Sequence, residues 1–170
     1  LFWKKETANM QYRPSISGYT TTLNCFDQGY PFQKSINSLL NFCDEVVVVD
    51  GGSTDGTWEK LQEMASNDAT IVIKKIDRDW NHKRFAVYDG AQKAEARALC
   101  TKEYCWQMDA DEIAPAGTRE KIKTLIDSWP AAVDLISLPV VEYWGSQQKV
   151  RIDVNPWKWR LSKNLPHITN

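Results

Sequence analysis

The amino-acid sequence predicts an α/β fold with a mainly parallel central sheet, and three observations lead to this prediction. Strand-like and helix-like hydrophobic patterns alternate from one end of the 170 residues to the other. The run EVVVV at 45–49 is nearly continuous in β-branched residues, as in strands covered on both faces. No repeat, low-complexity tract or Gly/Ser linker breaks the alternation. We therefore expect one domain over residues 1–170, truncated at its C-terminus because the chain stops soon after a strand-like run.

Each element is predicted from its own pattern. Short runs of β-branched and aromatic residues indicate strands, and apolar residues spaced three or four apart indicate helices. The predicted strands cover 16–23, 45–49, 70–74, 104–108 and 133–141, with 149–154 and 157–161 as later strands or a hairpin. The predicted helices cover 32–43, 58–65, 85–99 and 122–129, and the last ends before Pro130.

Composition narrows the class of protein. The 21 Lys and Arg balance 22 Asp and Glu, so no overall field attracts nucleic acid, and an anionic ligand must be bound locally. No apolar run approaches the ~20 residues of a membrane span, and the first ten residues are too polar for a signal peptide. The four cysteines lack paired spacing and mostly lie in apolar segments, which favours buried reduced thiols. We expect a cytoplasmic protein, with a peripheral position at a membrane left open.

A glycine-rich loop, DGGSTDGT at 50–57, follows the second predicted strand. In a parallel sheet, ligands bind beyond the carboxyl ends of the strands. Glycines and Asp also suit a plain strand-to-helix turn, with Thr54 or Asp55 as the helix N-cap. However, free backbone N–H groups beside a helix N-terminus attract anions, and Asp50 could accept hydrogen bonds from a base or ribose. The loop lacks both the Gly-Lys-Ser/Thr of a Walker loop and the G-x-G-x-x-G dinucleotide motif.

An acidic cluster, WQMDADE at 106–112, places three carboxylates directly after an apolar run. A solvated turn could explain it, but three like charges at the rim of a sheet repel one another unless something positive lies there. Mg²⁺ and Mn²⁺ prefer oxygen ligands and commonly bind through one or two carboxylates plus substrate phosphates. The pattern therefore predicts a divalent metal that holds a diphosphate.

The order of these motifs resembles family 2 glycosyltransferases with the GT-A fold. NCFDQGYPFQKSINSLLNFCDEVVVVDGGSTDGTWEKL is followed by WQMDADE, and HKRFA at 82–86 loosely matches a Q-K-N-F-A-like segment between them. The branch that carries VDSGSTDGT and LDADE, typified by lipopolysaccharide core-type transferases, is the most similar. The resemblance covers residues 16–113 well, and it implies a Rossmann-like, three-layer GT-A sandwich.

The resemblance also implies an activity and a set of site residues. Family members move a sugar from a nucleoside-diphosphate sugar to an acceptor hydroxyl, use Mn²⁺ or Mg²⁺ at the departing diphosphate, and mostly invert configuration. Asp111 would ligate the metal, and Asp109 would meet the ribose or a metal-bound water and is also a candidate ligand. His167 is an additional candidate ligand, and Glu112 is a candidate for metal or sugar contacts. The implied nucleotide-sugar contacts are Thr21, Thr22, Leu23, Asn24, Asp50, Gly51, Ser53, Lys83, Arg84, Asp109 and Ala110.

Two departures from the family pattern leave the nucleobase and the sugar unassigned. Gly51 stands where the commoner loop VDDGSTDGT has an Asp that can contact the base, and Leu23 stands where a Tyr is usual. An inverting reaction needs a general base near the acceptor hydroxyl. Glu142 and Asp153 are weak candidates for that base, which could also lie beyond Asn170. The acceptor, whether a glycan, a lipid-linked sugar or a protein, is not predicted.

Two other classes of protein compete with this interpretation. A haloacid-dehalogenase-type phosphatase also places D-x-D after an apolar strand, but DADEI lacks the usual Thr or Val two residues after the second Asp. A non-catalytic module that binds a nucleotide sugar or a metal fits the same residues if the base is absent. Joint binding of a divalent metal and a nucleoside diphosphate separates transferase from phosphatase, and turnover of a donor sugar separates enzyme from binding module.

Overall fold

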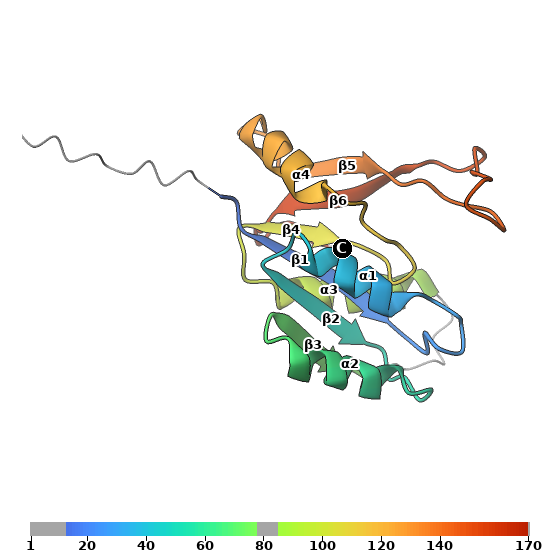
Figure 1. Ribbon diagram of the computed structural model, residues 1–170. Coiled ribbons are helices and arrows are strands. Elements are labelled where there is room, and N and C mark those ends of the chain that lie inside the picture. The colour runs from blue at the N-terminus through green and yellow to red at the C-terminus, as the bar shows by residue number, and fades with distance from the viewer. Residues whose placement is uncertain (1–12, 78–84, 170) are drawn as a thin grey trace, which may run out of the picture.

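The computed structural model describes residues 13–77 and 85–169 and forms a six-stranded sheet with helices on both faces (Figure 1). The strands are β1 Ile16–Thr22, β2 Glu45–Asp50, β3 Ile71–Lys75, β4 Tyr104–Gln107, β5 Leu135–Pro139 and β6 Trp157–Lys163. The helices are α1 Phe32–Leu40, α2 Thr57–Asn67, α3 Phe85–Ala98 and α4 Thr118–Asp127. These elements confirm the predicted order of strands and helices up to β5, with differences of a few residues at their ends.

The strand order is β3-β2-β1-β4-β6-β5, and the sheet is mainly parallel as predicted. The strands β3, β2, β1 and β4 are parallel, β6 runs antiparallel to β4, and β5 runs antiparallel to β6. The register pairs Thr22 with Asp50 and Tyr19 with Gln107. The ends of β1, β2 and β4 therefore meet at one side, called here the carboxyl edge, and their starts at Ile16, Glu45 and Tyr104 form the amino edge.

The sheet is the middle of three layers (Figure 1). One apolar cluster joins α1, α2 and α4 to one face of the sheet, and a smaller cluster lies on the face that α3 covers. Val46 and Val48 belong to the first cluster and Val47 and Val49 to the second, and all four are fully buried. Burial on both faces explains the continuous apolar run of β2. At Gly18 an added Cβ would lie 2.9 Å from the Cys43 sulfur, so the chain after α1 packs closely on β1.

The later part of the chain departs from one prediction. The segment 149–154 forms no named strand. The two sides of the arm at 140–156 are joined by an isolated bridge between Tyr143 and Val150 and by backbone hydrogen bonds such as the one from the Arg151 N–H to the Glu142 oxygen (2.8 Å). Because β5 is parallel to β4, this arm leaves the sheet at the carboxyl edge, where Figure 1 shows it projecting from the body. Alternating side chains favour a strand only where a neighbouring strand is present to pair with it, and Ile152 is 95% exposed.

Two further expectations can be compared with the structure. The four cysteines are free thiols, and Cys25, Cys43 and Cys105 are buried, as predicted. Within residues 13–77 and 85–169, no helix has both the length and the apolar character required to cross a bilayer.

Candidate functional site

The turn after β2 is built around the carboxylate of Asp50, which is fully buried. It accepts hydrogen bonds from Thr22 Oγ1 (2.9 Å), from the backbone N–H groups of Gly52 (3.0 Å) and Ser53 (2.7 Å), and from Ser53 Oγ (2.6 Å). Gly52 and Gly56 have φ of 93° and 92°, a conformation that side chains disfavour. Asp50 thus organises the turn. Its contact with a nucleoside stays a prediction, which is not favoured because both of its carboxylate oxygens already accept hydrogen bonds from the turn or from Thr22.

The loop after β1 interlocks with this turn. The side-chain oxygen of Asn24 accepts from the Thr54 N–H at 2.9 Å, and the Asn24 N–H donates to Ser53 Oγ at 2.9 Å. Thr57 Oγ1 accepts from the N–H of Cys25 at 3.0 Å. The predicted contacts Thr22 and Asn24 therefore hold the two loops together as one platform. Their neighbours Thr21 and Leu23 are partly exposed at the same edge.

The acidic loop, residues 109–112, follows β4 and is not helical. Lys93 from α3 lies 2.8 Å from the carboxylate of Asp109, measured from Nζ to Oδ1. Arg160 from β6 lies 3.6 Å from Asp109 Oδ2, forms an ion pair with Glu112, and donates to the side-chain oxygen of Gln107. The amide of Gln107 in turn donates to Asp109 Oδ1 at 2.9 Å.

The positive charge that the acidic cluster requires is therefore supplied, for two of its three carboxylates, by the chain itself. Burial works to raise the pKa of Asp109, but Lys93 and Arg160 outweigh it and hold that pKa below its usual value. Burial raises the pKa of Glu112 even though Arg160 opposes the shift. Lys93 is shared, since its Nζ also lies 2.9 Å from the carboxylate of Asp89. Neither Lys93 nor Arg160 was predicted from the sequence. Because these cations offset the repulsion among the carboxylates, that repulsion alone does not require a metal ion.

Asp111 differs from its neighbours. It is exposed, and its carboxylate has no hydrogen bond or ion pair with any described residue. Burial raises the pKa of the Cys25 thiol to about 11, and the carboxylates of Asp50, Asp55 and Asp111 add to this rise. The parallel register of β2, β1 and β4 likewise places the glycine-rich turn and the acidic loop at the carboxyl edge, as predicted.

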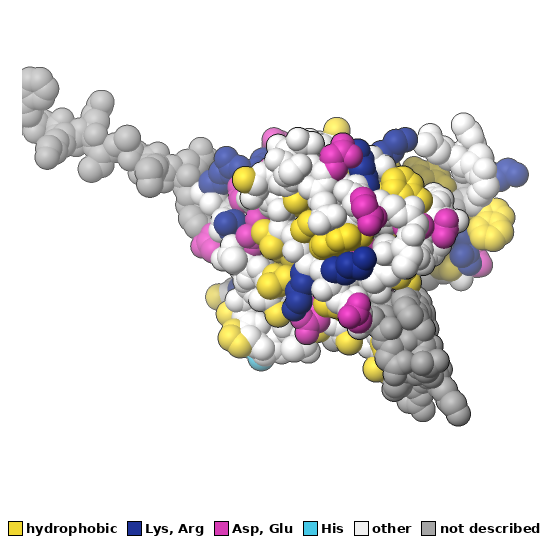
Figure 2. All heavy atoms as spheres, turned by 90° about the horizontal axis from the view of Figure 1, so that it is seen from below, with side chains coloured by type: hydrophobic (Ala, Val, Ile, Leu, Met, Phe, Trp, Pro, Cys, Tyr) yellow, Lys and Arg dark blue, Asp and Glu magenta, His cyan; other side chains and the backbone are white. Residues whose placement is uncertain are grey.

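The described part of the chain holds no cluster of three or more His, Cys, Asp or Glu arranged for a metal ion. A cation at Asp111 would need most of its oxygen ligands from a bound nucleotide and from water, which is common for Mg²⁺. On the face drawn in Figure 2, the Lys and Arg side chains are interspersed with Asp and Glu, in keeping with a net charge of −1. Capture of an anion therefore depends on local groups.

His167 requires a correction. Its Nε2 lies 3.2 Å from Asp134 Oδ2, and it follows β6, whose last residue Lys163 pairs with Tyr104 at the start of β4. Because β6 runs antiparallel to β4, the residues after it lie at the amino edge. His167 and Asp111 are therefore on opposite edges of the sheet, and His167 does not join Asp111 as a metal ligand.

The two candidate bases lie on the projecting arm. Arg151 binds Asp153 at 2.9 Å and lies 3.7 Å from the carboxylate of Glu142, so both acids share one guanidinium. Lys158 also lies 3.7 Å from Glu142. The arm leaves from the correct edge, but its acids are already paired. Lys83 and Arg84 lie outside the described residues.

A cavity of about 360 Å³ opens beside the turn, at the carboxyl end of β3 on the α3 side. Its lining includes Ile76, Asp77, Tyr88 and Gln92. The Ile76 N–H donates to the backbone oxygen of Asp50 at 2.8 Å, so the cavity borders the platform. Gln92 is buried, and its amide donates to two backbone oxygens at the ends of β1 and β2 (3.0 and 2.7 Å). The helix α3 is thereby fixed to this edge.

Comparison with known proteins decides the family. The family model described as glycosyl transferase family 2 matches residues 21–167. The chain belongs to glycosyl transferase family 2. The predicted resemblance, including the lipopolysaccharide core type, is confirmed.

Two curated relatives show how much of a family protein is present. The lipopolysaccharide core biosynthesis glycosyltransferase LpsC of Rhizobium meliloti is 34% identical over 102 residues, which cover 60% of this chain and 34% of LpsC. An uncharacterised glycosyltransferase of Rickettsia conorii is 30% identical over 120 residues, which cover 71% of this chain and 37% of that protein. The chain thus spans about a third of the length of these relatives.

Solved structures confirm the GT-A fold. TarS of S. aureus matches 88% of this chain and 28% of its own, with a TM-score of 0.63 and 20% identity. The mannosyltransferase PcManGT from Pyrobaculum calidifontis, solved in complex with GDP-Man and Mn²⁺, matches 78% of this chain and 37% of its own, with a TM-score of 0.57 and 21% identity. At this identity the likeness establishes the fold.

Proposed function

We propose that this glycosyltransferase domain binds a nucleoside-diphosphate sugar at the carboxyl edge, with Mn²⁺ or Mg²⁺ held by Asp111, for transfer of the sugar to an acceptor hydroxyl. The observation that carries the proposal is the state of Asp111. Its carboxylate is exposed and without a described partner, while Asp109 and Glu112 beside it are paired with Lys93 and Arg160. One available carboxylate and the oxygens of a diphosphate are a typical Mg²⁺ environment.

The nucleoside lies against the platform in this proposal. The nucleoside is bordered by Thr21, Leu23 and the backbone of Gly51. The cavity beside Ile76 supplies room for part of the nucleoside. The diphosphate then points toward Asp111, while Asp109 contacts the ribose or a metal-bound water. Two solved relatives of the same fold support this class of ligand, since PcManGT was solved with GDP-Man and Mn²⁺ and a TarS fragment with UDP.

Sugar transfer needs positive charge at the departing diphosphate and a base for the proton of the acceptor hydroxyl. A bound metal ion would neutralise the charge that develops on the departing diphosphate. Lys93, at Asp109, adds a cation near the same place. Inversion requires a base for the acceptor proton. Glu142 and Asp153 remain the candidates on the chain, and either acid must first separate from Arg151.

The pairing of both candidate bases favours one alternative, a domain that binds the donor without catalysing transfer. Donor turnover tests this alternative. Release of free nucleoside diphosphate from a UDP-sugar or GDP-sugar panel, with water or added glycans as acceptor, is expected from an enzyme. Donor binding without any release under these conditions is expected from a binding module.

Thermal unfolding with nucleotides tests the binding proposal itself. UDP and GDP are each added with and without Mn²⁺, because a ligand that binds only the folded state raises the unfolding temperature. We expect a rise with one nucleotide and Mn²⁺ together that exceeds the sum of the separate rises. The control is Asp127→Asn, which breaks an exposed ion pair with Lys123 on α4 and should leave this rise unchanged. If neither nucleotide stabilises the protein in the presence of Mn²⁺, the proposal is wrong.

A further inference from the structure

Arg160 is a buried cation whose described side-chain partners lie in the acidic loop or at the end of β4 just before it. Its side chain is only 6% exposed. A buried guanidinium is costly unless it is paired and hydrogen-bonded. In the described structure its side chain contacts Gln107, Asp109 and Glu112, all at the carboxyl end of β4. The sequence gives Arg160 no such role, since it alternates with Trp159 and Leu161 like any polar residue of a half-buried strand.

The contacts of Arg160 bracket the acidic loop. Gln107 is the last residue of β4, and Glu112 closes the loop, because its second carboxylate oxygen accepts from the Asp109 N–H at 3.1 Å. The Glu112 N–H donates to the Asp109 backbone oxygen at 3.0 Å, which forms a tight turn with Asp111 inside it. Arg160 thus holds the residues before and after Asp111 without contacting Asp111.

We propose that Arg160 is a positioning residue that fixes the acidic loop so that the carboxylate of Asp111 faces the bound metal and diphosphate. The planar guanidinium suits this role because it can bind two acceptors from different directions at once, which the single ammonium of Lys does less well. Arg160 also engages the two carboxylates that would otherwise compete with Asp111 for a cation. This inference rests on the proposed function of Asp111.

Three variants test it. Arg160→Gln removes the charge but keeps a polar side chain, Arg160→Lys keeps the charge but not the fork, and Lys158→Gln is the matched control. Lys158 lies on the same strand, and its ion pair is with Glu142 on the arm. For each protein, the affinity for UDP and for GDP is measured by calorimetry with and without Mn²⁺, and the unfolding temperature is recorded.

The quantity that matters is the gain in nucleotide affinity that Mn²⁺ provides. In Arg160→Gln we expect this gain to fall by about 10- to 100-fold, the usual effect of removing a group that orients a metal ligand. The nucleotide affinity without Mn²⁺ stays at the wild-type value, because the substitution does not alter the platform formed by the loops after β1 and β2. Arg160→Lys recovers part of the gain at most, and Lys158→Gln keeps all of it.

The outcomes separate this inference from the proposed function. If the wild-type protein shows no Mn²⁺-dependent gain, the proposed function fails first and the inference falls with it. If the wild type shows the gain and folded Arg160→Gln keeps it, the inference alone is overturned. Equal losses of metal-free and metal-dependent affinity would also overturn it, since they indicate a general structural role. If Arg160→Gln does not fold, Arg160→Lys decides, and an undiminished gain in that variant overturns the inference.

Discussion

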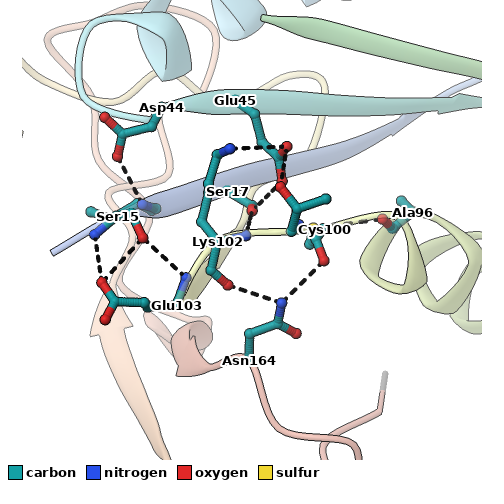
Figure 3. Close-up of polar contacts among 11 residues, drawn as sticks. Ser15, Ser17, Asp44, Glu45, Ala96, Cys100, Lys102, Glu103 and Asn164 are labelled. Atoms are coloured by element: carbon teal, nitrogen blue, oxygen red, sulfur yellow. Dashed lines mark hydrogen bonds and ion pairs between the residues drawn. The ribbon is translucent and has the colours of Figure 1, made fainter.

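One carboxylate from each edge of the sheet, Glu45 and Asp111, has the opposite surroundings to the other. At the amino edge, Glu45 is buried and accepts a hydrogen bond from Ser17 Oγ (Figure 3). It also accepts hydrogen bonds from both the N–H and the hydroxyl of Thr101. At the carboxyl edge, Asp111 is exposed and its carboxylate has no partner among the described residues. A saturated buried acid contributes to stability, whereas an exposed unsaturated acid is available to a ligand. The comparison therefore assigns a stabilising role to Glu45 and ligand binding to Asp111.

The amino edge is tied together by polar groups from distant parts of the chain. Asp44 accepts from the Ile16 N–H at 2.9 Å, and Glu103 accepts from Ser15 at 3.1 Å. The amide of Asn164, beyond β6, donates to the backbone oxygens of Cys100 and Lys102 at 3.1 and 2.9 Å. Figure 3 shows these groups converging on the starts of β1, β2 and β4. These hydrogen bonds join the starts of the three strands to one another and to the chain after β6.

The largest expected effect concerns Asp111→Asn. Loss of the one available carboxylate should weaken Mn²⁺-dependent binding of UDP or GDP on the order of 100-fold, about 2.7 kcal/mol, without lowering the unfolding temperature. Asp109→Asn should weaken it less, because Asp109 is already paired with Lys93. Calorimetric titration with and without Mn²⁺ measures both. If wild type and Asp111→Asn bind the nucleotide with equal affinity in the presence of Mn²⁺, Asp111 is not a metal ligand.

Asp50 sharpens the comparison, because it lies at the carboxyl edge but is saturated like Glu45. In Asp50→Asn, an amide nitrogen replaces one of the carboxylate oxygens that accept hydrogen bonds from Thr22, Gly52 and Ser53, so a donor loses its acceptor. The free energy of unfolding should therefore fall by about 2–3 kcal/mol. Denaturant unfolding measures this loss, and nucleotide titration of the same variant measures affinity. Retained affinity with reduced stability assigns Asp50 to the turn. A loss of affinity in a variant of unchanged stability assigns it to the nucleoside.

Glu45→Gln tests the stabilising role of this residue directly. It should reduce the free energy of unfolding by about 2 kcal/mol, since the donors of Ser17 and Thr101 lose a charged acceptor, and should leave nucleotide affinity unchanged. The control is Glu63→Gln, which breaks an exposed pair with Lys60 and should change stability by about 0.5 kcal/mol or less. A Glu45→Gln protein as stable as the control would show that Glu45 does not have this role.

The smallest effect is the pH dependence of Glu45. Burial works to raise its pKa, but hydrogen bonds from Ser17 and Thr101 outweigh burial and hold the pKa below its ordinary value of 4.5. A lowered folded-state pKa adds stability that is complete above the unfolded-state pKa and is lost as the pH falls through the folded-state pKa. The stability difference between wild type and Glu45→Gln should thus be constant near neutral pH and shrink below about pH 4.5. Unfolding curves over this range that show a constant or growing difference would contradict the assignment.

Local features of the sequence predicted most of the fold and part of the site. EVVVV indicated a strand buried on both faces because every position along such a strand is covered, and D-x-D directly after an apolar run indicated acids at a strand end. Both signals depend on residues adjacent in the chain. The glycine-rich turn was placed correctly for the same reason, although its Asp50 proved to be engaged within the turn.

The cations of the site could not be predicted because their partners are distant in the sequence. Arg160 meets Glu112 only because β6 lies beside β4, and Lys93 meets Asp109 only because α3 packs on that face. His167 was misplaced for a related reason. An alternating apolar pattern is the same for parallel and antiparallel strands, so the direction of β6, and with it the edge to which His167 belongs, is not encoded locally.

The proposed role of Asp111 can be tested in crystals grown with Mn²⁺ and the nucleoside diphosphate that binds best, because the anomalous scattering of manganese locates the ion. We expect a peak in direct contact with the carboxylate of Asp111 at the carboxyl edge, with the diphosphate on its other side and Arg160 still bound to Glu112. A nucleotide bound with no metal at Asp111, or a peak at the amino edge beside Asp134 and His167, would contradict it.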